Sequence, residues 1–174
     1  MFTSIVVAFD GSPHATRALE TAASLAVENK ASLGIIHVVE PSHMTIPDGA
    51  QRMAEVEHVI KPAPKLLVNL ENIPAEVVSS LTEAAAESQR VAFQLADLMV
   101  VRAKDDASKA GVADITTEVI VGNPAEEILS FASSRKADLI VIGSRGFGKL
   151  KSMLLGSTSH KVTQHAECSC LTVK

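Results

Sequence analysis

The chain has 174 residues, a length typical of one domain, and 47% of them are hydrophobic, which excludes an intrinsically disordered protein. Its 16 basic and 20 acidic residues give a net charge of −4, which argues against a dedicated nucleic-acid-binding protein. No apolar run approaches the roughly 18 residues that a membrane-spanning helix needs, and no basic segment of a signal peptide precedes the first apolar run. We therefore expect a cytoplasmic protein that binds neither membrane nor nucleic acid, with its two cysteines reduced.

The N-terminal part predicts a strand, a helix and a second strand. Residues 4–9 and 33–39 are short, continuously apolar runs, which are typical of strands buried on both faces of a parallel sheet. Ser12 and Pro13 form a helix start, with a capping side chain followed by proline at the first helical position. The apolar residues that follow recur at helical spacing and are mostly alanine, so we expect this helix to lie close to the sheet.

The middle of the chain has a weaker pattern. Five of the seven prolines fall between Pro41 and Pro74, and we interpret residues 42–74 as an excursion with partial helix inside a single domain of residues 1–174. Residues 75–110 contain neither glycine nor proline, which predicts a helix, with room for one break, that ends at Gly111.

The C-terminal part continues the alternation. We predict strands at 116–121, 137–142 and 168–173 and a short helix at 156–165. Asn123 and Glu126 have the spacing of a capping box, with Pro124 at the first helical position. Alternating strands and helices indicate one parallel sheet with helices on both faces, which is a doubly wound α/β domain.

A glycine-rich loop between a strand and a helix, over residues 143–158, suits phosphate binding because the helix start offers unpaired N–H groups. Three common phosphate motifs fail here. Leu150 stands where a Walker A loop has serine or threonine, and Lys151 stands where a dinucleotide fingerprint has its third glycine. Ala8 stands where an aspartyl phosphatase would have its nucleophile.

The spacing that does fit is Gly143-x2-Gly146-x9-Gly156-Ser157, and with it the chain resembles the nucleotide-binding branch of the universal stress protein family. The resemblance covers about residues 2–41 and 110–174. It implies a five-stranded parallel sheet in the order 3-2-1-4-5 and a homodimer that pairs through the last strand. One departure is Ser169, which stands where the family often has proline and restores an N–H group on that strand.

The resemblance also implies the ligand, an adenine nucleotide. ATP is the first choice, with ADP or AMP as alternatives, and Mg²⁺ is expected only together with the bound nucleotide. Asp10 and Val38 would contact the adenine, and Ile142 and Gly143 would lie along the ribose. The phosphates would be surrounded by Arg145, Gly146, Gly156, Ser157 and Thr158, and the implied set is completed by Ala8, Ser12, Ser144, Gly148 and Lys149. The glycines suit this role because they let the backbone approach a ligand closely.

Three functions follow as alternatives. The first is a stress-response sensor or regulator that binds the nucleotide and hydrolyses it slowly or not at all. The second is a slow ATPase in which His14 or His160 acts as a base, and the third is a dimeric scaffold with no nucleotide. Of the remaining residues, we expect His37 to be a hydrogen-bonded core histidine and Cys168 and Cys170 to pack as small apolar groups, although with His165 they have part of the spacing of a metal site. We favour the first function, with no catalytic residues and no metal site of its own.

Overall fold

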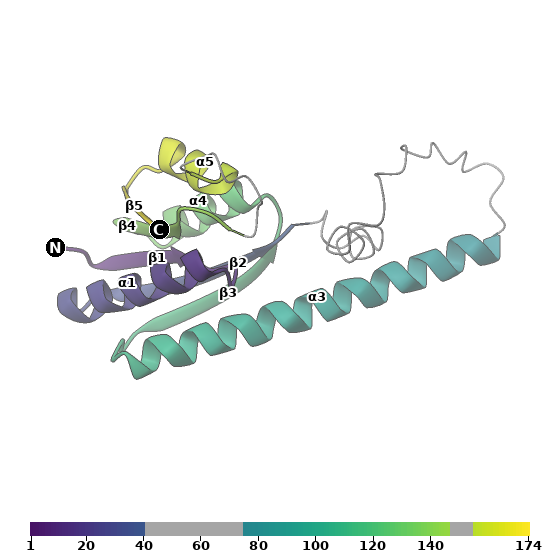
Figure 1. Cartoon of the computed structure of the whole chain (residues 1–174), viewed down its shortest axis with the longest axis horizontal. Coiled ribbons are helices and arrows are strands. Elements are labelled where there is room, and N and C mark those ends of the chain that lie inside the picture. Colours follow the sequence, from purple (N-terminus) through teal and green to yellow (C-terminus); the bar gives the residue numbers. More distant parts are fainter. Residues whose placement is uncertain (41–74, 147–154) are drawn as a thin grey trace. The chain divides into compact units, whose positions relative to one another are not determined.

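The computed structural model describes residues 1–40, 75–146 and 155–174. Its five strands form one parallel sheet in the order β3-β2-β1-β4-β5, as expected (Figure 1). The strands are β1 Ser4–Ala8, β2 Ser32–Val39, β3 Ile115–Val121, β4 Leu139–Gly143 and β5 Ser169–Val173.

Helices cover both faces of the sheet (Figure 1). They are α1 Pro13–Asn29, α3 Ala75–Lys109, α4 Pro124–Ser134 and α5 Ser157–His165. One core lies between the sheet and the alanine-rich faces of α1 and the second half of α3, where small side chains such as Ala22 and Ala103 let the helices approach closely. A second core lies between the other face and α4 and α5, where Phe131 and Val162 pack.

Contacts divide the chain into two units. One unit comprises Met1–Val39 and Leu95–Lys174 and holds the whole sheet, and the other comprises Glu40–Gln94. Apart from Glu40, the described part of the second unit is helical and belongs to α3. The excursion predicted at 42–74 lies outside the described residues. Among the described residues, no helix combines the length and the apolar character that crossing a membrane requires.

The predicted helix boundaries are confirmed by their hydrogen bonds. Ser12 Oγ accepts from the Ala15 N–H at 3.2 Å, and Asn123 Oδ1 accepts from the Ala125 N–H at 3.1 Å, so both helices have the expected side-chain caps. Gly111 has φ +100°, a conformation that favours glycine, and it follows directly after the last turn of α3. The long helix is unbroken over its 35 residues.

The residues around the start of β5 form contacts within the sheet and with the second core. The Ser169 N–H donates to the Asp138 carbonyl at 3.3 Å, so it bonds toward β4 and adds no donor at the open edge of the sheet. Cys168 and Cys170 are free, half-buried and packed against the second core, as expected for small apolar groups. Burial raises the pKa of both thiols.

Asp138 ties together the amino ends of β1 and β4. Its carboxylate accepts from the Thr3 N–H at 2.7 Å and the Thr3 hydroxyl at 2.8 Å, and from the Ser4 N–H at 3.3 Å. Burial by itself would raise the pKa of Asp138, but the hydrogen bonds from Thr3 and Ser4 outweigh it and hold the pKa below its ordinary value.

Candidate functional site

The carboxyl ends of β1 and β4 bring together residues that are more than 130 positions apart. These strands are neighbours, and the chain winds away from them in opposite directions, β1 toward β2 and β4 toward β5. Such a reversal leaves a crevice outside the strand ends, which is where α/β sheets bind ligands. Asp10 follows β1, and residues 144–146 follow β4.

The turn after β1 is fixed by several contacts. Asp10 Oδ1 accepts from the Ser12 N–H at 2.9 Å, and the buried Ser12 hydroxyl lies 3.5 Å from the Arg145 carbonyl oxygen. Gly11 has φ +79°, and a β-carbon there would come within 2.6 Å of Met99 Cε. The turn thus favours glycine for its backbone conformation, whereas the flexible end of the Met99 side chain can shift to relieve the contact.

Asp10 and Gly146 lie side by side. A β-carbon on Gly146 would come within 2.5 Å of Asp10 Oδ2, so the second carboxylate oxygen fills the space that a side chain at 146 would need. The structure therefore brings together two of the predicted site residues, one from each strand end.

Gly143 is explained by helix packing. A β-carbon there would lie 2.9 Å from the His14 carbonyl carbon and 3.0 Å from the Ala15 nitrogen. The first turn of α1 occupies the space that a side chain at position 143 would need. A glycine at this position is thus required by the contact between β4 and α1, whatever binds nearby.

Ser144 connects four elements. Its N–H donates to the Val173 carbonyl at 2.6 Å, and its carbonyl accepts from the Gly156 N–H at 2.7 Å and from the Ser159 hydroxyl at 3.0 Å. Its own hydroxyl is hydrogen-bonded to His14 Nδ1 at 3.2 Å. Because Ser144 is only 2% exposed, it acts as an anchor for α1, α5 and β5 around the end of β4.

The start of α5 lacks the side-chain cap that α1 and α4 have. Gly156 is the N-cap residue and makes no side-chain hydrogen bond to the helix. The first intrahelical bond runs from the His160 N–H to the Gly156 carbonyl, so the N–H groups of residues 157–159 have no partner among the described residues. Three unpaired donors at the positive end of the helix dipole form a favourable site for an anion.

The apolar residues of the predicted site differ in exposure. Ala8 and Ile142 are buried in the second core, whereas Val38 is half-buried at the end of β2. Nearby, His37 Nδ1 lies 2.7 Å from the Phe9 carbonyl oxygen, which can only accept, so Nδ1 carries the proton. The expected hydrogen bond of His37 is confirmed, although its side chain is half-buried rather than fully enclosed.

The phosphate-binding residues are only partly described. Arg145 is half-buried, Ser157 is exposed and Thr158 is half-buried, and all three lie at the ends of β4 and α5. The predicted site residues Gly148 and Lys149 fall in 147–154, outside the described residues. Sequence interpretation did not single out Ser159, whose buried hydroxyl lies 3.0 Å from the carbonyl oxygens of both Ser144 and Gly156 and shares its one proton between them.

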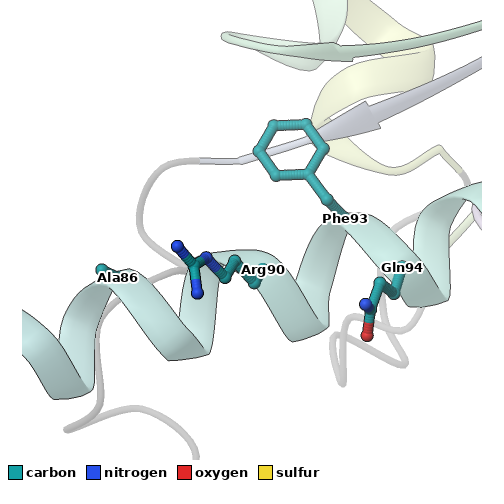
Figure 2. Close-up of a pocket in the computed structure, with 4 residues that line it drawn as sticks. All are labelled: Ala86, Arg90, Phe93 and Gln94. Atoms are coloured by element: carbon teal, nitrogen blue, oxygen red, sulfur yellow. The ribbon is translucent and has the colours of Figure 1, made fainter.

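Two pockets lie elsewhere on the described surface. One of about 420 Å³ is lined by Ala86, Arg90, Phe93 and Gln94 of α3 (Figure 2). Another of about 160 Å³ lies between the end of α1 and the loop that precedes β3. Neither contains a predicted site residue. The described residues contain no group of three or more His, Cys, Asp or Glu side chains that could hold a metal ion.

Comparison with known proteins identifies the family. The model of the universal stress protein family matches residues 1–174. The universal stress protein YxiE of Bacillus subtilis is 33% identical over 175 residues, and the alignment covers all of both chains.

Solved structures share the fold. A universal stress protein in complex with cAMP is 23% identical with a TM-score of 0.59, covering 99% of this chain and 96% of the other. The universal stress protein from Archaeoglobus fulgidus in complex with dAMP is 20% identical with a TM-score of 0.56, covering 99% and 98%. With a family match over its whole length and a relative at this identity, the chain belongs to the universal stress protein family.

Proposed function

We propose that this protein binds an adenine nucleotide at the carboxyl ends of β1 and β4 and acts as a stress-response sensor or regulator. ATP is the first candidate, with ADP and AMP as alternatives. The observation that carries the proposal is the start of α5, where three N–H groups have no partner among the described residues and the N-cap glycine has no side chain to cap them. The complexes of two structural relatives with cAMP and dAMP support the same ligand class.

The residues present fit a nucleotide in distinct roles. The N–H groups of Ser157 and Thr158 would bind a phosphate, with the guanidinium of Arg145 as its counter-charge. Asp10 and Val38 would receive the adenine, one through its carboxylate and the other through its apolar side chain. Ser144 and Ser12 are buried, so their part is to hold the strand ends and the helix starts in place.

Hydrolysis should be slow or absent. Among the described residues that directly follow β1 and β4, Asp10 is the one carboxylate, and one of its oxygens already accepts from the Ser12 N–H. His14 Nδ1 is hydrogen-bonded to the buried Ser144 hydroxyl, which leaves only Nε2 of that ring for base catalysis. Mg²⁺ would therefore be held mainly by the phosphates and water. A slow ATPase that uses His14 or His160 is the alternative function.

A homodimer through β5 is part of the same proposal. Among the described strands, β5 lies at the edge of the sheet and pairs with β4 alone, and Ser169 and Leu171 are exposed on it. An open edge offers unpaired N–H and C=O groups to a second copy of the strand. We propose that the whole chain functions as a single domain in this dimer.

The absence of tryptophan and tyrosine gives a direct test. Protein absorbance near 260–280 nm is small, so a dialysed sample reports bound nucleotide through its spectrum. We expect close to one equivalent of an adenine compound, identified by mass spectrometry after denaturation, or a rise in melting temperature when ATP, ADP, AMP or cAMP is added. A flat spectrum with no thermal shift from any of the four would favour the nucleotide-free scaffold.

A further inference from the structure

A methionine of α3 lies against the turn that carries Asp10. The Cε atom of Met99 lies 2.6 Å, and its Sδ atom 3.8 Å, from the position that a β-carbon on Gly11 would occupy. Because Gly11 has no side chain, the thioether end of Met99 lies directly on the backbone of this turn. Both residues belong to the unit that holds the whole sheet.

Met99 lies at the margin of the face of α3 that packs. Ala96 and Ala103, about one turn before and after it on the same face of the helix, are 2% and 0% exposed. Met99 itself is only half-buried, and Gly11 beside it is exposed. The methionine is therefore positioned by packing and still open to small molecules from the solvent.

The turn under Met99 is part of the candidate site. Asp10 Oδ1 accepts from the Ser12 N–H at 2.9 Å, and Asp10 Oδ2 fills the space beside Gly146. The proposed function assigns the adenine to Asp10, which directly precedes Gly11 in the chain. A chemical change at the end of the Met99 side chain would thus act on the backbone that positions this carboxylate.

The thioether of methionine is a target of small oxidants. Its sulfur attacks one oxygen of hydrogen peroxide, the O–O bond breaks, and the products are methionine sulfoxide and water. The sulfur loses two electrons, which the peroxide gains. The apolar side chain becomes a polar one, with an oxygen that carries partial negative charge and accepts hydrogen bonds.

A sulfoxide oxygen at Met99 has two places to go. If it stays on Gly11, it lies near the carboxylate of Asp10, and the two negative groups repel each other. If the flexible end of the side chain turns to the solvent instead, Gly11 loses its apolar cover. Both outcomes disturb the turn that holds Asp10, whereas the described residues of the two cores do not include Met99, so the fold should survive.

We propose that Met99 is a modification site, and that its oxidation to the sulfoxide by peroxide lowers the affinity of the candidate site for nucleotide. The inference rests on the proposed function, because it concerns the regulation of the same site. The protein would release its nucleotide when oxidant is present. Sulfoxide reductases, with a dithiol as electron donor, would convert the sulfoxide oxygen to water and restore binding.

Nucleotide titrations before and after peroxide treatment test this proposal. ATP, ADP, AMP and cAMP are each titrated into the wild-type protein and into Met99→Leu. The variant is a matched control, because it keeps an apolar side chain of similar volume and retains the other methionines and both cysteines. We expect peroxide to weaken binding by the wild-type protein about fivefold and to leave binding by Met99→Leu unchanged. Treatment with sulfoxide reductases should reverse the loss.

Peptide mass spectrometry identifies the methionine that has reacted. Trypsin cleaves after Arg90 and Arg102 to give peptide 91–102, whose only sulfur is that of Met99, and cleaves after Arg17 to release Met1 in a separate peptide. Met1 is 97% exposed and therefore reports the dose of oxidant. Met99→Gln, whose amide is polar as the sulfoxide is, should bind nucleotide weakly without any oxidant and keep its melting temperature.

The outcomes separate the two claims. If the untreated wild-type protein binds none of the four nucleotides, the proposed function fails, and its regulation fails with it. If it binds, and oxidation of Met99 leaves the affinity unchanged or Met99→Leu loses as much, the modification proposal is overturned while the proposed function stands. The proposal is also overturned if Met99 stays unmodified in the folded protein at a dose that fully oxidises Met1.

Discussion

The carbonyl oxygen of Ser144 accepts a hydrogen bond from the Gly156 N–H at 2.7 Å, which joins the end of β4 to the start of α5. The position of α5 is thus set by contacts at the two ends of the glycine-rich loop, and the Ser159 hydroxyl adds a second bond to the same carbonyl. A helix start that is anchored in this way offers its N–H groups in a preorganised arrangement.

The two glycines of this region should respond differently to the same change. Gly143→Ala places a methyl group 2.9 Å from the α1 backbone, and overpacking of this kind costs about 1–3 kcal/mol. In Gly156→Ala the nearest atom is 3.5 Å away, so the cost is the weaker N-cap preference of alanine, about 0.5 kcal/mol. Thermal denaturation should show a clearly larger loss for Gly143→Ala. Equal losses would mean that α1 does not approach Gly143 as described.

Ser159→Ala should loosen the candidate site. It removes a hydroxyl whose one proton is shared between two backbone carbonyls, which costs about 1 kcal/mol or roughly 2–4 °C in melting temperature. We expect nucleotide affinity to fall as well, since the start of α5 loses a contact with β4. Thr163→Ala is the matched control, because it removes a hydroxyl bond within the same helix but none to β4. If Thr163→Ala lost as much nucleotide affinity as Ser159→Ala, the bond between Ser159 and β4 would not be what holds the site in place.

Asp138→Asn should change the pH dependence of stability. The pKa of Asp138 is lowered in the folded protein, so its carboxylate stabilises the fold above the ordinary value of 3.8, and this stabilisation is lost as the pH falls through the lowered pKa. The wild-type protein should therefore be more stable than the variant by a constant amount from about pH 5 to 8, and the difference should shrink in acid. Urea denaturation at several pH values measures it. A stability difference between wild type and variant that grows toward low pH would contradict a lowered pKa of Asp138.

Local signals in the sequence were sufficient for the order and boundaries of the elements. Ser12 and Asn123 cap the helices that their sequence neighbours predicted, and these caps depend on residues within one turn. The alternation of strands and helices indicated a parallel sheet, whereas the order of its strands was implied by the family resemblance alone. The positions of Asp10, Gly146 and Gly156 near the carboxyl ends of β1 and β4 then follow from the fold.

Contacts between distant elements could not be predicted in this way. The approach of α1 to Gly143, the contact of Met99 with Gly11 and the bond between His14 and Ser144 each join residues from different helices and strands. Nothing near Met99 in the sequence distinguishes it from other apolar residues of a long helix. Ser159 similarly looks like an ordinary polar helix residue until its carbonyl partners are known.

The most direct test of the central claim is a calorimetric titration of AMP into the wild-type protein, Ser157→Asp and Gln164→Asp. Both variants add one negative charge to α5, but a carboxylate at position 157 lies at the helix start, where it stabilises the helix and repels a phosphate. We expect the wild-type protein and Gln164→Asp to bind AMP, and Ser157→Asp to lose binding by at least tenfold without a lower melting temperature. Undiminished binding by Ser157→Asp would contradict a phosphate site at the start of α5.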